Sequence, residues 1–154
     1  LASLDPSIIT DDLRSIVEAG LDLVRVHGHV ARPELYQAAD RLGLLVWQDL
    51  PLVGPYATSA RKTARAVARS AVDLLGHHPS VAYWCAHDEP NGPPLPAPAR
   101  AGDPEAPTAR RLARQYAPSW NRSVLDPMLR RGLTAADASR PVVTRSGSGP
   151  EIRA

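Results

Sequence analysis

The sequence has few of the features that mark several common classes of protein. Its single cysteine, Cys85, excludes an intramolecular disulfide framework. No segment approaches the roughly 18 consecutive apolar residues of a membrane-spanning helix, so we expect no membrane span. The first residues, LASLDPSIITDD, carry acids where a signal peptide carries basic residues and an apolar core. Because the chain does not begin with methionine, we expect a piece of a longer soluble protein and leave its compartment open.

Lysine is almost absent, and no strongly basic surface is indicated. Lys62 is the only lysine, and the net charge is +2 with acidic and basic residues interspersed. Three clustered arginines, Arg110, Arg111 and Arg114, are interpreted as a solvated helix face, so we expect no nucleic-acid partner. Neither G-x-G-x-x-G nor a P-loop follows any candidate strand, which gives a nucleotide site no support. We therefore expect no cofactor.

What the sequence does contain is a regular alternation of helical and strand patterns. Short apolar strands separated by amphipathic helices predict a parallel sheet covered by helices. Residues 90–107 are rich in proline, glycine and alanine and are expected to form an irregular loop. Helices are expected at residues 10–20, 32–43, 59–78, 108–116 and 120–133, and strands at 23–26, 44–51, 81–86 and within 140–149. An open doubly wound sheet and part of an eight-stranded barrel both satisfy this pattern.

Polar side chains follow each predicted strand, and this distribution favours the barrel. The carboxyl ends of barrel strands face one mouth, where the residues of an active site collect. Open sheets also bind ligands at these ends, so the signal is weaker than a motif. The strand-end residues are Arg25 and His27, Trp47 and Asp49, the run His87, Asp88 and Glu89, and finally Arg145 and Ser146.

Several segments resemble the catalytic barrel domain of glycoside hydrolase family 2, which includes β-galactosidases, β-glucuronidases and β-mannosidases. LVRVHGHV is similar to the second barrel strand of the family, and PELYQAADRLGLLVWQDLP to its next helix and third strand. HPSVAYWCAHDEP is similar to the fourth strand, and DASRPVVTRSG to the entry of the fifth. The resemblance implies an α/β fold, a partial (β/α)8 TIM barrel with about strands two to five, forming one domain over residues 1–154.

The resemblance makes Glu89 the general acid/base of a retaining glycoside hydrolase that cleaves O-glycosidic bonds of β-linked sugars. Retention requires two carboxyl groups about 5–5.5 Å apart. One of them must hold a proton near neutral pH, which burial or a neighbouring like charge favours. The family usually has asparagine where this chain has Asp88. The charge of Asp88 would either help to keep Glu89 protonated or mark an altered site.

The nucleophile is the second carboxylate of the expected site, and no residue here matches it. The family carries it as a glutamate on the seventh strand, and neither Glu105 nor Glu151 can be carried over. We therefore expect the 154-residue chain to be inactive alone and to need the remaining half of the barrel or a partner chain. The resemblance further implies a carbohydrate substrate bound by Arg25, His27, Trp47, Asp49, His87 and Asp88, with no metal ion.

Two other functions stay open from the sequence. His27 and His29 form a His-x-His pair at a strand end, as in metal-dependent amidohydrolase barrels, where both imidazoles bind one ion. That alternative needs further ligands at later strands, of which His87 would be one. The other alternative is a non-catalytic carbohydrate-binding remnant, which Asp88 and the unmatched nucleophile suggest.

Overall fold

The computed structural model describes residues 5–88 and 119–146 of the chain. Its centre is one parallel sheet in the order β1-β2-β3-β4, so each strand lies beside the next one along the chain. Doubly wound sheets reverse their strand order at a switch point, whereas barrel winding does not. The described strands contain no reversal, which favours the barrel. These strands are β1 (Leu23–Val26), β2 (Leu45–Asp49), β3 (Val81–Cys85) and β4 (Val142–Val143).

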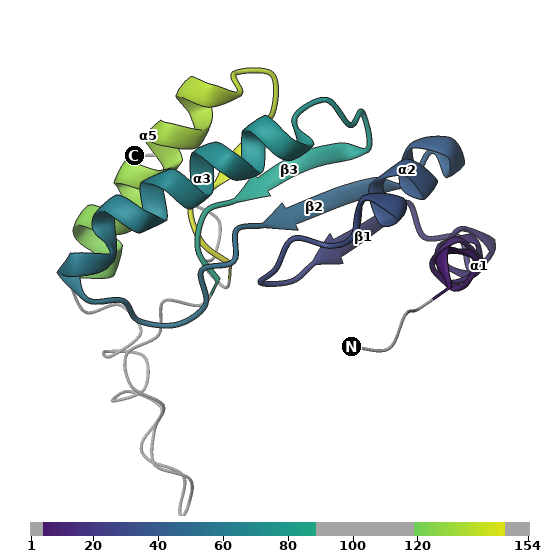
Figure 1. Ribbon diagram of the computed structural model, residues 1–154, viewed down its shortest axis with the longest axis horizontal. Coiled ribbons are helices and arrows are strands. Elements are labelled where there is room, and N and C mark those ends of the chain that lie inside the picture. The colour runs from purple at the N-terminus through teal and green to yellow at the C-terminus, as the bar shows by residue number, and fades with distance from the viewer. Residues whose placement is uncertain (1–4, 89–118, 147–154) are drawn as a thin grey trace, which may run out of the picture.

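Helices connect the strands and pack in pairs. Figure 1 shows α3 and α5 side by side over one part of the sheet, and α1 beside α2 at the other end of the molecule. No helix in the described ranges is both long and apolar enough to cross a membrane. The helices are α1 (Pro6–Glu18), α2 (Pro33–Leu42), α3 (Arg61–Leu75) and α5 (Asp126–Ala136), with the short turns η1 (Thr58–Ala60) and η2 (Asn121–Leu125).

The predicted alternation of helices and strands is confirmed, with corrections at the ends of elements. The first helix begins at Pro6 rather than at residue 10, because the Asp5 carboxylate caps it by accepting from the Ser7 amide at 2.9 Å. The third strand ends at Cys85, and the long helix predicted over 59–78 is α3 preceded by η1. The predicted loop 90–107 and helix 108–116 lie outside the described residues.

The core lies between the sheet and the helices that cover it. The face of α3 that packs against α5 is built largely from small side chains, which allow the two helices to approach closely. The facing stripe of α5 supplies large ones, and Trp84 of β3 is fully buried beneath them. The buried residues of the two helices include Ala64, Ala68, Ala71, Met128, Leu129 and Leu133.

The amino ends of the strands are joined by one arginine. Arg140, just before β4, donates to the carbonyl oxygens of Gly76 at 3.0 Å, His78 at 2.9 Å and Val81. It also pairs with the Asp137 carboxylate at 2.6 Å. These contacts fix the start of β3 against the turn that leads into β4, and they leave the opposite edge of the sheet for the polar strand-end residues.

Candidate active site at the carboxyl edge of the sheet

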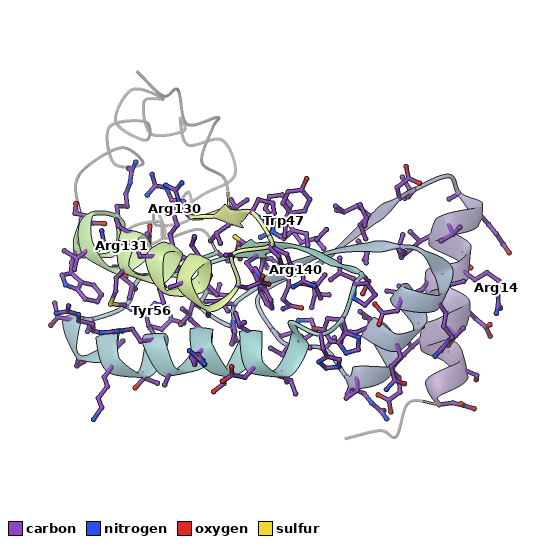
Figure 2. The ribbon with its side chains drawn as sticks, turned by 90° about the horizontal axis from the view of Figure 1, so that it is seen from above. Arg14, Trp47, Tyr56, Arg130, Arg131 and Arg140 are labelled. Atoms are coloured by element: carbon purple, nitrogen blue, oxygen red, sulfur yellow. The ribbon has the colours of Figure 1, made fainter. Side chains whose placement is uncertain are left out.

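The polar strand-end residues do meet at one edge of the sheet. The arrowheads of β1, β2 and β3 point the same way in Figure 1, away from α1. Side chains at or just beyond the ends of all four strands share hydrogen bonds there. Trp47 lies on the sheet, far from Arg14 of α1 (Figure 2). The members of this strand-edge cluster are Arg25, His27, Asp49, Asp88 and Ser146.

Asp49 is the fully buried anchor of the strand-edge cluster. Arg25 donates to it through Nε, 3.2 Å from Oδ1 and 3.1 Å from Oδ2, and through a terminal nitrogen 2.7 Å from Oδ2. The Trp47 indole donates to Oδ1 at 2.9 Å, and the Gly28 amide donates to Oδ2 at 3.3 Å. Both carboxylate oxygens are therefore satisfied, which a buried charge requires. This agrees with a carboxylate that orients its neighbours.

Asp88 is the second buried carboxylate of the cluster, and three side chains bind it. Arg25 donates to its Oδ1 at 2.7 Å, Ser146 donates to the same oxygen, and His27 Nε2 contacts Oδ2. Burial alone would raise the pKa of the Asp88 carboxyl, but the hydrogen bonds from Ser146, Arg25 and His27 hold this pKa below its usual range. Asp88 is consequently ionised at neutral pH.

Arg25 is the cation that holds the two carboxylates together. One of its terminal nitrogens lies 2.7 Å from an oxygen of Asp49 and 2.7 Å from an oxygen of Asp88. The hydrogen bond to Asp49 is the largest cause of the raised pKa of Arg25. Neither carboxylate is suited to donate a proton, because both are stabilised as anions.

The cluster also has the composition of a small metal site. Its geometry bears on the amidohydrolase alternative, which requires His27 and His29 to bind one ion. Among the described residues, His27, Asp49 and Asp88 place ligand atoms within 4.8 Å of one another. His29 is not in that group, since its exposed ring is bound at 2.9 Å to the backbone oxygen of His27. Arg25 already bridges the two carboxylates, and a guanidinium in that place repels a dication. The donor set therefore fits arginine better than metal.

An aromatic surface adjoins Arg25 on the sheet. Trp47 and Tyr83 occupy paired positions on β2 and β3, and their rings stack with centroids 5.7 Å apart. The Arg25 guanidinium carbon lies 6.0 Å from the centre of the Trp47 ring. Both rings are half-buried, so each still presents some surface. Such faces bind the C–H groups of sugars, and they also pack in cores.

Known proteins similar to this chain are sugar hydrolases. β-Mannosidase B of Thermothelomyces thermophilus is 34% identical over 84 residues, covering 51% of this chain and 10% of that protein. The β-D-mannosidase structure from Dictyoglomus thermophilum matches 96% of this chain and 17% of its own, with TM-score 0.70 and 19% identity. The structure of β-glucuronidase 3 from Bacteroides uniformis matches 92% of this chain and 16% of the glucuronidase chain, with TM-score 0.65 and 21% identity. No family model matches the chain.

The resemblance to glycoside hydrolase family 2 is confirmed. At these identities the solved family 2 structures show the fold, which is α/β with a parallel sheet. The chain spans only 10% of the length of the curated β-mannosidase that it matches.

The comparisons with family 2 proteins assign no role to individual residues of this chain. Glu89, the expected acid/base, lies outside the described residues, directly after Asp88. Arg25, His27, Asp49 and Asp88 share one hydrogen-bonded cluster, and Trp47 donates into it.

His87, the remaining predicted substrate-binding residue, is separate from that cluster. Its ring is fully buried, and its two nitrogens are bound to Asp126 and to the Gly54 carbonyl.

Sequence reasoning missed two residues of this region. Tyr83 pairs with Trp47 in the sheet register, and the alternation of side chains along β3 was the available signal. Asp126 of α5 binds the buried His87, which lies 39 positions earlier, and no local sequence pattern predicts such a contact. Ser146 was recognised as a strand-end residue, and the structure shows that it binds Asp88.

Proposed function

We propose that the gene product containing this chain is a retaining β-glycosidase of the family 2 type, with Glu89 as its general acid/base. The observation that carries the proposal is the strand-edge cluster, which fixes Asp88 at the carboxyl edge of a barrel-type sheet. Glu89 follows Asp88 directly, so its backbone starts from this fixed point. The names of the relatives, β-mannosidase and β-glucuronidase, support a β-linked sugar as substrate.

The described residues suggest how a sugar would be held beside Glu89. Arg25 and His27 are exposed, so both can form hydrogen bonds with sugar hydroxyls while they still bind the buried Asp88 carboxylate. The exposed part of the Trp47 ring offers an apolar face. Asp88 can only accept hydrogen bonds while it is ionised, which favours a sugar hydroxyl as its partner. Asp49 is enclosed and acts by orienting Arg25.

The nucleophile is proposed to come from barrel strands other than those described. Asp49 and Asp88 are both paired with Arg25, which makes each of them a poor nucleophile. In the described sheet β1 and β4 are the edge strands, and Leu23 of β1 is 39% exposed. Further strands, from the same chain or from a partner chain, would cover these edges.

Hydrolysis of aryl β-glycosides by the purified gene product tests the proposal. We expect turnover of a β-mannoside or β-glucuronide and first release of the β-anomer by NMR. Glu89→Gln should lower kcat about 10²- to 10⁴-fold, as expected for loss of a general acid/base. Glu18→Gln, at the exposed end of α1 that leads into the amino end of β1, is the matched control and should leave kcat unchanged.

Three results would contradict the proposal. Equal activity of the Glu89→Gln variant and the unsubstituted protein would remove Glu89 from the reaction. Sugar binding without turnover would support the carbohydrate-binding remnant instead. Stoichiometric zinc in the purified protein, lost on substitution of His27, would support the amidohydrolase alternative.

A further inference from the structure

A second group of charged side chains lies buried beneath the strand-edge cluster. The His87 ring and the Asp126 side chain have no exposed surface. His87 Nδ1 lies 2.7 Å from Asp126 Oδ1, and Nε2 lies 2.7 Å from the carbonyl oxygen of Gly54. Arg145 donates to the other Asp126 oxygen at 3.2 Å. A fully buried imidazole with both nitrogens engaged has no atom left for a substrate.

The partners of the His87 ring determine where its protons lie. The Gly54 carbonyl can only accept, so Nε2 carries a proton. Without a proton between them, Nδ1 and the Asp126 oxygen would be two buried acceptors facing each other at 2.7 Å, which is strongly unfavourable. The pair therefore holds two protons, one directed at Gly54 and one shared with Asp126.

The position of Asp126 is set by an unusual turn at the start of α5. The Asp126 amide donates to the Asn121 carbonyl, five residues earlier, which closes the wide turn η2. Pro127 follows and has no amide hydrogen to donate. Asn121 in turn exchanges two hydrogen bonds with the backbone of Tyr56, at 3.0 and 3.2 Å. The Tyr56 ring lies 5.6 Å from the His87 ring, and Figure 2 shows Tyr56 beside α3 and α5.

These contacts hold the chain on both sides of Asp88. The His87 carbonyl accepts from the Ser146 amide at 3.0 Å. The Asp88 amide donates to the Leu52 carbonyl at 2.8 Å, and the Asp88 carbonyl accepts from the Gly54 amide at 3.2 Å. Gly54 thus contacts the His87 ring and the Asp88 backbone together. A change in the His87–Asp126 contact would be transmitted to Asp88, and from there to Glu89.

We propose that His87 and Asp126 form a proton-sharing positioning pair, which orients Asp88 and Glu89 for the reaction without touching the sugar. This inference rests on the proposed function. Glycosidase reactions depend on the geometry of the acid, and a displacement of about 1 Å at a reacting group lowers rates by up to about 100-fold. The pair would therefore act on kcat more than on KM.

The chain offers a matched control at the opposite edge of the sheet. His78 Nδ1 lies 2.6 Å from Asp40 Oδ2, and His78 is nearly buried at the start of β3. This pair also joins an imidazole to a carboxylate, but it lies before β3, at the end opposite to His87 and to the strand-edge cluster. Substitution of His78 should lower stability without changing kcat.

Two isosteric substitutions of His87 separate its two hydrogen bonds. Asparagine places its amide near the position of Nδ1 and can still donate to Asp126. Glutamine places its amide near the position of Nε2 and can still donate to Gly54. We expect His87→Gln to lower kcat about 10- to 100-fold on an aryl β-glycoside, with less change in KM, and His87→Asn to retain more activity.

The control distinguishes positioning from a purely structural role. His78→Gln and His87→Gln, which both remove the hydrogen bond at Nδ1, are compared in the whole gene product by kcat and by the midpoint of urea unfolding. Loss of kcat in His87→Gln alone supports the proposal. If both variants unfold at lower urea concentration and both keep their kcat, His87 is structural and the proposal is overturned.

A double-substitution cycle tests the pair independently of any activity. His87→Gln, Asp126→Ala and the double variant are unfolded in urea. In the variant that already carries one substitution, we expect the other to shift the urea midpoint by less than about half of the shift it causes in the unsubstituted protein. Additive shifts would show that His87 and Asp126 do not act as a pair. If the unsubstituted protein turns over no β-glycoside, the proposed function fails, while this cycle still decides whether the pair exists.

Discussion

Asp88 accepts hydrogen bonds from three different side chains although it is almost completely buried. Its lowered pKa means that the folded protein stabilises the ionised form. This contribution to stability is present above the ordinary aspartate pKa of about 3.9 and is lost as the pH falls through the lowered value. In the active range of a glycosidase, Asp88 is thus a fixed negative charge beside the proposed acid.

The charge of Asp88 is predicted to influence the proton of Glu89. In Asp88→Asn the like charge is absent, so the acid should lose its proton at lower pH. We expect the basic limb of the pH profile of kcat/KM to move toward lower pH. Arg25 partly compensates the charge of Asp88, which limits the size of the shift. A basic limb that stays in place would show that Asp88 has no such role.

Gly28 is a residue at which a side chain would be strained and would require Val53 to move. Its φ is +66°, and a Cβ there would lie 2.7 Å from Val53 Cγ2. Gly28→Ala should lower the free energy of unfolding by about 2 kcal/mol or more, through backbone strain plus this clash. Its amide also binds Asp49, so the cluster should shift.

Gly43 provides the control for that substitution. It has a similar φ of +70° at the end of α2, but a Cβ there meets nothing within 4 Å. Gly43→Ala should lower the free energy of unfolding by only the strain, about 1 kcal/mol. Equal losses in urea unfolding for the two variants would show that the contact with Val53 has no effect.

At the scale of elements, the start of β3 depends on a single side chain that comes later in the chain. Arg140 donates to three carbonyl groups and to Asp137, and its side chain is only 16% exposed. Arg140→Ala should lower the free energy of unfolding by about 3 kcal/mol, since Asp137 then stays buried without its cation. Arg69→Ala, at an exposed pair with Asp73, should change stability little. Similar losses for both variants would contradict this account.

The Asp137 carboxylate makes the contacts between Arg140 and the start of β3 sensitive to acid. Burial favours a higher pKa for Asp137, but hydrogen bonds from Ser139, Trp84 and Arg140 lower it far below its usual range. The resulting stability is present above about pH 4 and is lost as the pH falls further. Asp137→Asn should therefore be less stable than the unsubstituted protein at pH 7, and the difference should narrow toward pH 2. Urea midpoints measured across this range check the prediction, and a constant difference would refute it.

At the scale of the whole molecule, the described residues contain neither of the two catalytic carboxyl groups that the proposed retaining mechanism requires. Retaining hydrolysis takes two carboxyl groups, and the two that are described at the strand ends are both bound by Arg25. We expect the isolated 154-residue chain to show no turnover of aryl β-glycosides above the buffer rate. Turnover that is lost in Glu89→Gln would contradict this expectation and would locate a nucleophile within the chain.

The sequence predicted the alternating architecture and the edge at which the site lies. Periodic apolar residues and strand-end polar residues are local signals, and they located Arg25, Asp49 and Asp88 correctly at one edge. The start of α1 was misplaced because the cap at Asp5 lies before the amphipathic stretch. Asp126 was missed because its contact with His87 is long-range, and an aspartate followed by proline has no distinctive pattern. The buried state of His87 could not be seen, since burial is decided by the packing of α5.

The contacts of Tyr56 with Asn121 and of His87 with Asp126 have a consequence for how such proteins can diverge. They join the two chain segments that flank residues 89–118 by bonds made outside that interval. Insertions, deletions or wholesale replacement beyond Glu89 in this connection would then leave the strand ends in register. Sequence divergence within that interval is therefore compatible with an unchanged strand-edge cluster and an unchanged His87–Asp126 pair.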